Sequence, residues 1–203
     1  MMNLPEYLVW IDCEMTGLNP DTECLVEIAA VVTDFDLNVL DEGIDLVIKP
    51  RPGTVEAMGD YVRKMHTDSG LIREFASGIE LADAEAQVLK YIKKYIPTAK
   101  TSPLAGNTIG TDRMFIAKYM PALDAHLHYR NIDVSTIKEL SKRWYPRSYF
   151  QAPKKDGGHR ALADILESIE ELKYYRQTVF VEGPGPSTEE AQAVAGAIRN
   201  DKL

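Results

Sequence analysis

The sequence predicts an α/β fold in which one mixed sheet is flanked by helices. Three strand-like segments open the chain and are joined by short polar connectors; shorter strand-like segments then alternate with helical patterns. Short connectors favour antiparallel neighbours, because a parallel pair needs a crossover of roughly a dozen residues. We therefore expect the first three strands to be antiparallel and the later strands to join the sheet in parallel.

The three opening strands are expected at residues 7–12, 25–35 and 38–48. The connectors between them, "NPDTE" and "DFDLN", are rich in Asp, Asn and Pro, which favour turns. The third segment partly alternates, so that Ile44 and Ile48 share one face with the residue midway between them, Leu46.

Helical periodicity begins after these strands. In chain order we expect a helix at 80–97, a short strand at 102–106, a helix at 111–121, a strand at 128–134, and helices at 135–146 and 159–176. The first and last of these helices carry apolar stripes, formed by Leu81, Val88, Leu89, Ile92 and Ile96, and by Leu162, Ile165, Leu166, Ile169 and Leu172. The helix at 135–146 is expected to begin with a capping box of Thr136 and Glu139.

The C-terminal segment differs from the rest in composition. We expect one domain over residues 1–180 and a tail over 181–203, which starts with the Pro/Gly-rich linker "VEGPGPSTEE". Residues 187–201 could form a short helix capped by Ser187 and Glu190. The sequence leaves open whether this tail is disordered or docks on the domain.

Composition excludes several classes of function. The 203 residues carry 31 acids against 23 Lys and Arg, a net charge of −8, which argues against tight nonspecific binding to long nucleic acid. A short anionic substrate could still be held by a metal and a few basic groups. No apolar run approaches the roughly 20 residues that span a bilayer, and no signal peptide is evident. Two cysteines make neither a disulfide framework nor a zinc site, so we expect a cytoplasmic protein that binds no membrane.

Two acids, Asp12 and Glu14, follow the apolar run "YLVWI" with one residue between them. Residues i and i+2 share a face in a strand, so both carboxylates should point to one side and Cys13 to the other. The same D-x-E pattern occurs at residues 21–23, in a turn, and at 83–85, on a helix where the two acids diverge by about 200°. Only the first pair can converge on a ligand, although ordinary solvation of a strand end is the simpler alternative.

Three further residues could complete a metal site. Asp112 stands where a strand and loop turn into a helix, a position that also suits the helix dipole without any function. His159 and Asp164 would point about 140° apart on a continuous helix, so they can share a site only if His159 lies on the loop before it. The Gly157-Gly158 pair allows such a loop. Clustered carboxylates favour Mg²⁺ or Mn²⁺ over zinc.

The segments "WIDCEMTGL", "GNTIGTDRMF" and "GGHRALADI" together resemble the three motifs of the DEDDh exonucleases, a branch of the ribonuclease H-like superfamily. The longer stretches "MHTDSGL", "GNTIGTDRMFIAKYMP", "HYRNIDVSTIKEL" and "YYR" are similar to the members of this family that degrade very short RNA. The resemblance covers about residues 6 to 180. It implies a ribonuclease H-like fold and a 3′-to-5′ exoribonuclease that releases nucleoside 5′-monophosphates, especially from dinucleotides.

The resemblance also implies roles for individual residues. Those that match the family's metal-binding acids are Asp12, Glu14, Asp112 and Asp164, which would hold two divalent cations, Mg²⁺ or Mn²⁺. His159 matches the general base that deprotonates the attacking water, a role that suits histidine because it exchanges protons near neutral pH. A mobile loop would let it close only over substrate.

Other matches imply a clamp for the substrate. Leu18 and Tyr61 fall where the family packs the terminal bases; the family commonly has Trp at the second position, and Tyr offers a smaller stacking surface. His66 matches a residue that contacts the 3′-terminal nucleotide. A phosphate cap at the 5′ end is matched by Thr108, Arg130 and Ser135, with Thr108 replacing the usual Ser. Ser135 is expected to precede a helix, whose N-terminal N–H groups favour anions.

One match implies an assembly. Tyr129 corresponds to a tyrosine that reaches the neighbouring subunit's active site, contacts substrate there and contributes to catalysis, which implies a homodimer. Two alternatives stay open: a DEDDh exonuclease acting on longer RNA or DNA, which a basic groove beside the site would favour, and a catalytically dead binding domain, which would lack at least one of the acids or the histidine.

Overall fold

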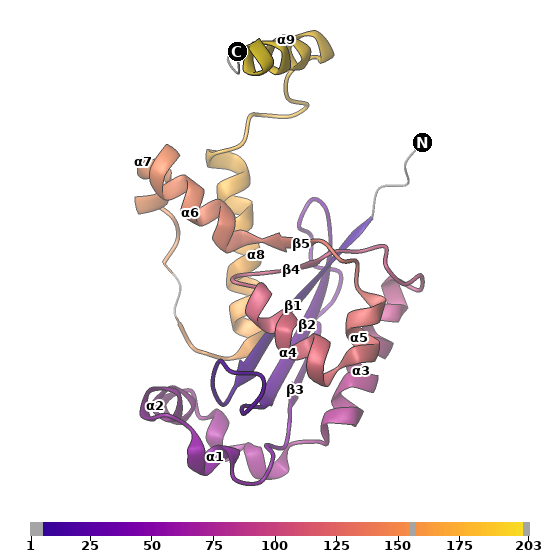
Figure 1. Cartoon of the computed structure of the whole chain (residues 1–203), viewed down its shortest axis with the longest axis vertical. Helices are drawn as coiled ribbons and strands as arrows, with labels where there is room; N and C mark the ends of the chain where they lie inside the picture. Colours follow the sequence, from indigo (N-terminus) through magenta and orange to yellow (C-terminus); the bar gives the residue numbers. More distant parts are fainter. Residues whose placement is uncertain (1–5, 155–156, 201–203) are drawn as a thin grey trace.

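A computed structural model describes residues 6–154 and 157–200 and shows a five-stranded mixed sheet in the order β3-β2-β1-β4-β5 (Figure 1). The first three strands pair antiparallel, whereas β4 pairs in parallel with both β1 and β5. This confirms the predicted fold class. The strands are β1 (Tyr7–Met15), β2 (Leu25–Asp34), β3 (Ile44–Val47), β4 (Leu104–Gly106) and β5 (Asn131–Asp133).

Helices cover both faces of this sheet. They are α1 (Thr54–Ala57), α2 (Asp60–Asp68), the 3₁₀ turns η1 (Leu71–Arg73) and η2 (Phe75–Ser77), α3 (Leu81–Tyr95), α4 (Gly110–Tyr119), α5 (Pro121–His126), α6 (Val134–Trp144), α7 (Pro146–Phe150), α8 (Ala161–Thr178) and α9 (Thr188–Asn200). One core lies between the sheet and helices α3, α4 and α5, and a second between the sheet and helices α6 and α8.

Strand β1 divides its side chains between the two cores. Val9, Ile11 and Cys13 belong to the first core, and Leu8 and Trp10 to the second. This alternation follows from the two-residue period of a strand. It places Asp12 and Glu14, by parity, on the same face as Leu8 and Trp10, which is the face that α8 covers.

Several boundaries differ from the predictions. β1 continues to Met15 instead of ending at residue 12, because β2 keeps pairing alongside it as far as Leu25. β3 is shorter than 38–48, since Asp41 lies in a bend and Gly43 adopts a left-handed φ of 79° directly before the strand begins. The third strand's alternation is confirmed, as Ile44, Leu46 and Ile48 all pack on the first core.

Two details of the helices were predicted wrongly. The N-cap of α6 is Asp133, whose carboxylate accepts the Ser135 N–H, so Thr136 and Glu139 form no capping box and Ser135 lies inside the first turn. On α8, Leu166 is 43% exposed and does not face inward, whereas Ile165 and Ile169 are buried as expected. Asp133 takes the cap because its short carboxylate already stands beside the first helical N–H groups.

A third, smaller apolar cluster lies at one end of the molecule, where α1 and α2 pack near the start of β2 (Figure 1). It contains Cys24, Val26, Met58, Leu71 and Phe75. The sequence patterns predicted neither helix, because α1 has four residues and α2 has a polar composition with no side-chain N-cap. This end of the molecule matters because α2 borders the candidate site.

The tail forms a helix at the opposite end of the long axis (Figure 1). The predicted cap of α9 is confirmed: Glu190 accepts the Ser187 N–H at 2.8 Å, and the Ser187 hydroxyl accepts the Glu190 N–H at 3.2 Å. Residue 201, the last of the predicted helix, lies outside the described residues.

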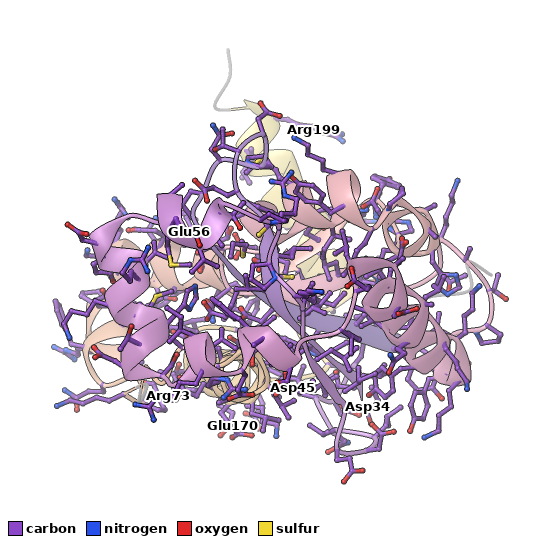
Figure 2. All side chains as sticks on the ribbon, turned by 90° about the horizontal axis from the view of Figure 1, so that it is seen from below. Asp34, Asp45, Glu56, Arg73, Glu170 and Arg199 are labelled. Carbon is purple, nitrogen blue, oxygen red and sulfur yellow. The ribbon has the colours of Figure 1, made fainter. Side chains whose placement is uncertain are left out.

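None of the helices in the described part of the chain has both the length and the apolar character needed to cross a membrane. Polar and charged side chains extend outward around the body, Glu56, Arg73 and Glu170 among them (Figure 2).

Candidate active site

Two acids lie within β1, side by side on one face of the strand. Asp12 is opposite Ala29 of β2 and is half-buried; Glu14 is opposite Glu27 and is only 7% exposed. The regular antiparallel ladder ends just after Glu14, where the register shifts. The pairing therefore holds both acids rigidly and brings Glu27, which is fully buried, close to Glu14.

Asp112 reaches the same place from the first turn of α4. Its Oδ1 accepts the backbone N–H of Cys13 at 3.0 Å, although the two residues are 99 positions apart in the chain. This hydrogen bond ties the start of α4 to Cys13, the residue between Asp12 and Glu14. Asp112 is only 6% exposed, so the surrounding atoms restrict the orientation of its side chain.

His159 and Asp164 enter from the start of α8. Asp164 lies in the first helical turn, and His159 lies two residues before the helix with a left-handed φ of 48°. The geometric condition from the sequence is therefore met: His159 is on the loop. One ligand atom each of Glu14, His159 and Asp164 lies within 4.8 Å of the others.

All five of these residues line one cavity of about 470 Å³. It is completed by Cys13, Met15, Leu18, Asn107, Thr108, Thr111, Gly157, Glu167 and Ser168. The predicted acids and histidine thus come from three separate parts of the chain to a single open cavity. The sheet supplies two of them, and the first turns of α4 and α8 supply two more.

The electrostatics of this cavity favour a bound cation. Burial, together with the charges of Asp164, Glu27 and Asp112, raises the pKa of Glu14 to about 8. Burial likewise raises the pKa of Asp112 to about 7, although the hydrogen bond from the Cys13 N–H opposes the shift. Carboxylates that repel one another at this distance are stabilised in their charged form by a hard divalent cation, so the donor set fits Mg²⁺ or Mn²⁺.

His66 lies behind Glu14 and not on the cavity surface. Its ring is completely buried, its Nε2 lies 2.8 Å from the Met15 carbonyl, and its Nδ1 is 3.8 Å from Glu14 Oε2. Burial lowers the pKa of His66, which favours the neutral ring. The structure therefore places His66 of α2 against Glu14, with its Nε2 held at the Met15 carbonyl.

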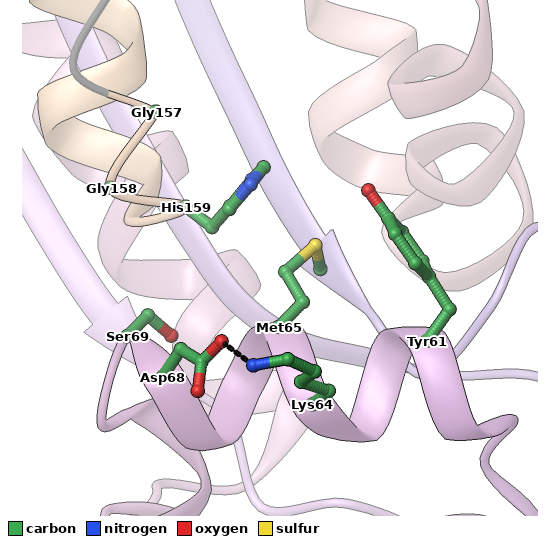
Figure 3. A pocket seen from close by; sticks show the side chains of 8 residues that line it. All are labelled: Tyr61, Lys64, Met65, Asp68, Ser69, Gly157, Gly158 and His159. Carbon is green, nitrogen blue, oxygen red and sulfur yellow. Dashed lines mark hydrogen bonds and ion pairs between the residues drawn. The ribbon is translucent and has the colours of Figure 1, made fainter.

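Leu18 and Tyr61 are among the most exposed apolar side chains, at 76% and 78%. Leu18 lines the acid cavity, whereas Tyr61 lines a second cavity of about 360 Å³ between α2 and the Gly157–His159 segment. Figure 3 shows Tyr61 and Met65 rising from α2 toward His159 across this second cavity. His159 lines both cavities and so joins them.

Thr108 and Ser135 form a hydrogen-bonded pair at the other side of the acid cavity. The Ser135 hydroxyl accepts the Thr108 N–H at 2.9 Å, and the two hydroxyl oxygens are 3.1 Å apart. Asp133 Oδ1 accepts both the Thr108 and the Ser135 N–H groups at 3.0 Å. Asp133 therefore already accepts one of the first N–H groups of α6, that of Ser135, and the Thr108 and Ser135 hydroxyl groups lie beside it.

Tyr129 and Arg130 lie on the connector before β5 and line neither cavity. Tyr129 is 74% exposed and stacks on His128 with ring centroids 4.5 Å apart. Arg130 Nε donates to the Tyr129 hydroxyl at 3.1 Å, and its guanidinium lies over that ring. The structure thus groups these two with each other and not with Thr108 and Ser135.

Sequence reasoning missed two residues that organise the site. Asn107 donates from Nδ2 to Ser168 Oγ at 2.7 Å and accepts the Ser135 hydroxyl at 2.9 Å, linking α8 to the Thr108–Ser135 pair. Glu27 receives hydrogen bonds from the start of α8. The signal for Glu27 was available, because a lone acid inside the apolar run "LVEIAAVV" must find a partner when the strand is buried.

Known proteins are similar to this chain in sequence. The exonuclease family model RNase_T matches residues 9–172. The chain is 62% identical over 198 residues to an oligoribonuclease of Leifsonia xyli subsp. xyli, covering 98% of this chain and 96% of that one. It is 61% identical to an oligoribonuclease of Rhodococcus jostii over 192 residues (94% and 96%) and 56% identical to one of Streptomyces avermitilis over 188 residues (93% and 94%).

Solved structures support the fold independently. An exonuclease I structure superposes with a TM-score of 0.61 at 17% identity, covering 86% of this chain, and the chain spans only 41% of that protein's length. A complex of E. coli exonuclease I with an oligonucleotide gives a TM-score of 0.57 at 16% identity, covering 85% of this chain and 40% of that one. At such identities the likeness concerns the fold, while the near-complete matches at 56–62% identity decide the family. With its exonuclease domain, its acid cavity and these relatives, the chain is a nuclease that belongs to the oligoribonuclease family.

Proposed function

We propose that the chain is a 3′-to-5′ exoribonuclease that degrades very short RNA, above all dinucleotides, to nucleoside 5′-monophosphates. One observation carries this proposal: Asp12, Glu14, Asp112, His159 and Asp164 line a single cavity. A binding domain without activity would not require all five. The family match over residues 9–172 supports an exonuclease domain within residues 1–180, with the tail from 181 to 203 as a separate segment.

The acids are proposed to hold two divalent cations, Mg²⁺ or Mn²⁺. When bound, such cations stabilise the charged oxygens of a phosphodiester displacement. The protein's own part is to fix the four carboxylates, through the β1–β2 ladder and the Asp112–Cys13 hydrogen bond, and to receive a proton. His159 is proposed to take that proton from the attacking water at a ring nitrogen, since it lies at the cavity mouth within reach of Glu14 and Asp164.

The exposed side chains around the cavity are proposed to limit the length of the substrate. Leu18 and Tyr61 offer exposed surfaces for the terminal bases. His66, whose ring is buried and lines neither cavity, is proposed to serve the 3′-terminal nucleotide only through its contact with Glu14. At the other side, Thr108 and Ser135 are proposed to bind the 5′ phosphate with their hydroxyl groups, joined by Arg130 if its guanidinium turns from Tyr129. A cap on the 5′ side leaves room for few nucleotides.

Substrate length tests this proposal. The protein should be incubated with Mg²⁺ or Mn²⁺ and 5′-phosphorylated RNAs from two to about twenty nucleotides, a range that separates short-oligomer enzymes from those with a long single-strand groove. We expect kcat/KM to be highest for the dinucleotide and to fall with length, because longer chains meet the cap. Equal or faster turnover of the long RNAs would instead support the alternative, a DEDDh exonuclease for longer RNA or DNA.

We further propose a homodimer in which Tyr129 reaches the neighbouring subunit's active site. Tyr129 lines neither cavity of its own chain, yet it is an exposed aromatic side chain held in place by His128 and Arg130. Aromatic residues of this kind are enriched at interfaces. The two free, buried cysteines, Cys13 and Cys24, suit the reducing cytoplasm in which we propose that the protein acts.

Mixing two inactive variants tests the role of Tyr129. Tyr129→Ala and His159→Asn should each lose activity alone. When they are unfolded together and refolded, mixed dimers should recover about a quarter of the wild-type rate, since half of the dimers are mixed and each holds one complete site. Tyr145→Ala, at another exposed tyrosine, is the control and should stay active. No recovery in a mixture that is dimeric by light scattering would place Tyr129 in its own site and contradict the proposal.

A further inference from the structure

The side chain of Arg160 forms hydrogen bonds that hold the segment carrying His159. Arg160 directly follows His159 and is the N-cap residue of α8. Its Nε donates to Glu27 Oε1 at 2.8 Å, its Nη1 to Glu74 Oε1 at 2.8 Å, and its Nη2 to Glu74 Oε2 at 3.4 Å. The guanidinium therefore bridges β2 to the turn between η1 and η2, and its planar fork fixes direction as well as distance.

Glu27 also accepts a second hydrogen bond from the same segment. Its other oxygen, Oε2, accepts the Ala161 N–H at 3.0 Å, so one carboxylate holds both the Arg160 side chain and the first N–H of α8. Glu27 is fully buried and stands opposite Glu14 in the β1–β2 ladder. Glu27, which anchors the start of α8, therefore lies directly opposite Glu14, one of the proposed metal-binding acids.

Within the described residues, His159 has no comparable restraint on its N-terminal side. Gly157, with a left-handed φ of 65°, and Gly158 precede it; a Cβ added to either would meet no atom within 4 Å. His159 itself is exposed and adopts a φ of 48°, which side chains other than glycine rarely adopt without support. The restraint on the histidine therefore comes from Arg160 and Ala161.

We propose that Arg160 is a positioning residue, which uses its bonds to Glu27 and Glu74 to hold His159 over the acid cavity. This inference rests on the proposed function, in which His159 accepts the proton. Arg160 lines neither cavity, so the proposed role is to act through the backbone of its neighbour. A displacement of about 1 Å at a reacting group can reduce a rate 100-fold, so a loss of this anchor should be visible in turnover.

The test compares three substitutions in the full-length protein with a 5′-phosphorylated dinucleotide and saturating Mn²⁺. Arg160→Met, which keeps the length but removes the fork, should lower kcat about 10- to 100-fold with little change in KM. Arg160→Lys should recover part of this loss. Arg176→Met is the matched control: Arg176 pairs with Asp36 from the far end of the same helix and should leave kcat unchanged.

Glu74→Gln extends the test to a residue away from the metal-site acids, with a side chain that is 44% exposed. It should lower kcat less than Arg160→Met and should have no further effect when combined with it, because both act through one anchor. This variant also keeps the inference testable if Arg160→Met folds poorly. An additive combination, or a rise in KM with kcat preserved, would overturn the positioning role.

His159→Asn separates the inference from the function on which it rests. If His159→Asn is inactive while Arg160→Met behaves like Arg176→Met, only the positioning role is overturned. If His159→Asn is fully active, the proposed role of His159 fails, and the positioning role fails with it. Loss of kcat in both variants, with Arg176→Met unchanged, supports both.

Discussion

Glu14→Gln is expected to lower kcat by about 1,000-fold or more while stabilising the metal-free protein at pH 8. The amide keeps the shape of the side chain but removes the charge that would bind a cation. Metal stabilisation of a displacement supplies several kcal/mol, and each 1.4 kcal/mol is about tenfold in rate. The same charge is unfavourable in the empty site, because Glu14 is buried beside Asp164, Glu27 and Asp112.

The stability change should depend on pH in a definite direction. The pKa of Glu14 rises from 4.5 to about 8 in the folded metal-free protein. Between these values the native state binds more protons than the unfolded state, so the free energy of unfolding falls as pH rises through this window. The loss is of order a few kcal/mol, at about 1.4 kcal/mol for each pKa unit. Glu14→Gln should flatten this slope, since glutamine does not titrate.

Thermal unfolding in EDTA between pH 5 and 8.5 measures the effect. The wild-type Tm should fall across this range more steeply than that of Glu14→Gln, and Mn²⁺ should raise the wild-type Tm more at pH 8 than at pH 6. Asp83→Asn is the control, because it belongs to the same D-x-E pattern but lies exposed on α3. An active Glu14→Gln protein, or one with the wild-type pH slope, would contradict the metal assignment.

Part of this site could be predicted from the sequence, because part of its geometry is local. Strand parity is local, so the sequence predicted Asp12 and Glu14 on one face and Cys13 on the other; the two cores confirm the alternation of β1 and the side that Cys13 takes. The antiparallel pairing of the first three strands followed from connector lengths, and the parallel part of the sheet from the alternation of later strands with helices. What local patterns could not supply is the distance from Glu14 to a helix that starts at residue 161.

The missed features share a physical cause, because each depends on contacts far apart in the chain. Helix α2 has weak signals of its own and is held by packing of His66 against Phe75. Leu166 fits the apolar period of α8, yet the sheet beneath α8 leaves it 43% exposed. The Arg160–Glu27 pair spans 133 positions, and only the sheet register brings its members together. Sequence periodicity reports which face is apolar, not which partner covers it.

The position of His159 shows this limit most clearly, because it depends both on the local backbone conformation and on hydrogen bonds to a residue far away in the chain. A left-handed φ costs an ordinary residue about 1–2 kcal/mol, and the sequence gives no sign that His159 adopts one. The two preceding glycines allow the turn, and the hydrogen bonds of Arg160 and Ala161 to Glu27 fix its far side. Functional positions commonly hold such strain, because the rest of the fold determines their backbone.

His159→Asn is expected to lower kcat by about 100- to 10,000-fold, the usual contribution of a general base. Asparagine is the right substitution because it tolerates a left-handed φ better than alanine, so the backbone of the loop is preserved. The variant should keep the wild-type Tm and the metal-induced rise in Tm. Activity should be measured with the dinucleotide at several Mn²⁺ concentrations, and Asp83→Asn, at an exposed position of α3 outside both cavities, is the control.

The dependence on Mn²⁺ decides between two roles that the geometry allows. A ring nitrogen of His159 lies within 4.8 Å of ligand atoms of Glu14 and Asp164, which would also suit a metal ligand. If His159 bound the cation, His159→Asn would raise the Mn²⁺ concentration needed for half-maximal activity, and excess metal would restore the rate. If His159 only accepts the proton, half-saturation stays near its wild-type value and kcat remains low at every Mn²⁺ concentration. We expect the second result, because four carboxylates already supply the oxygen ligands that these hard cations prefer.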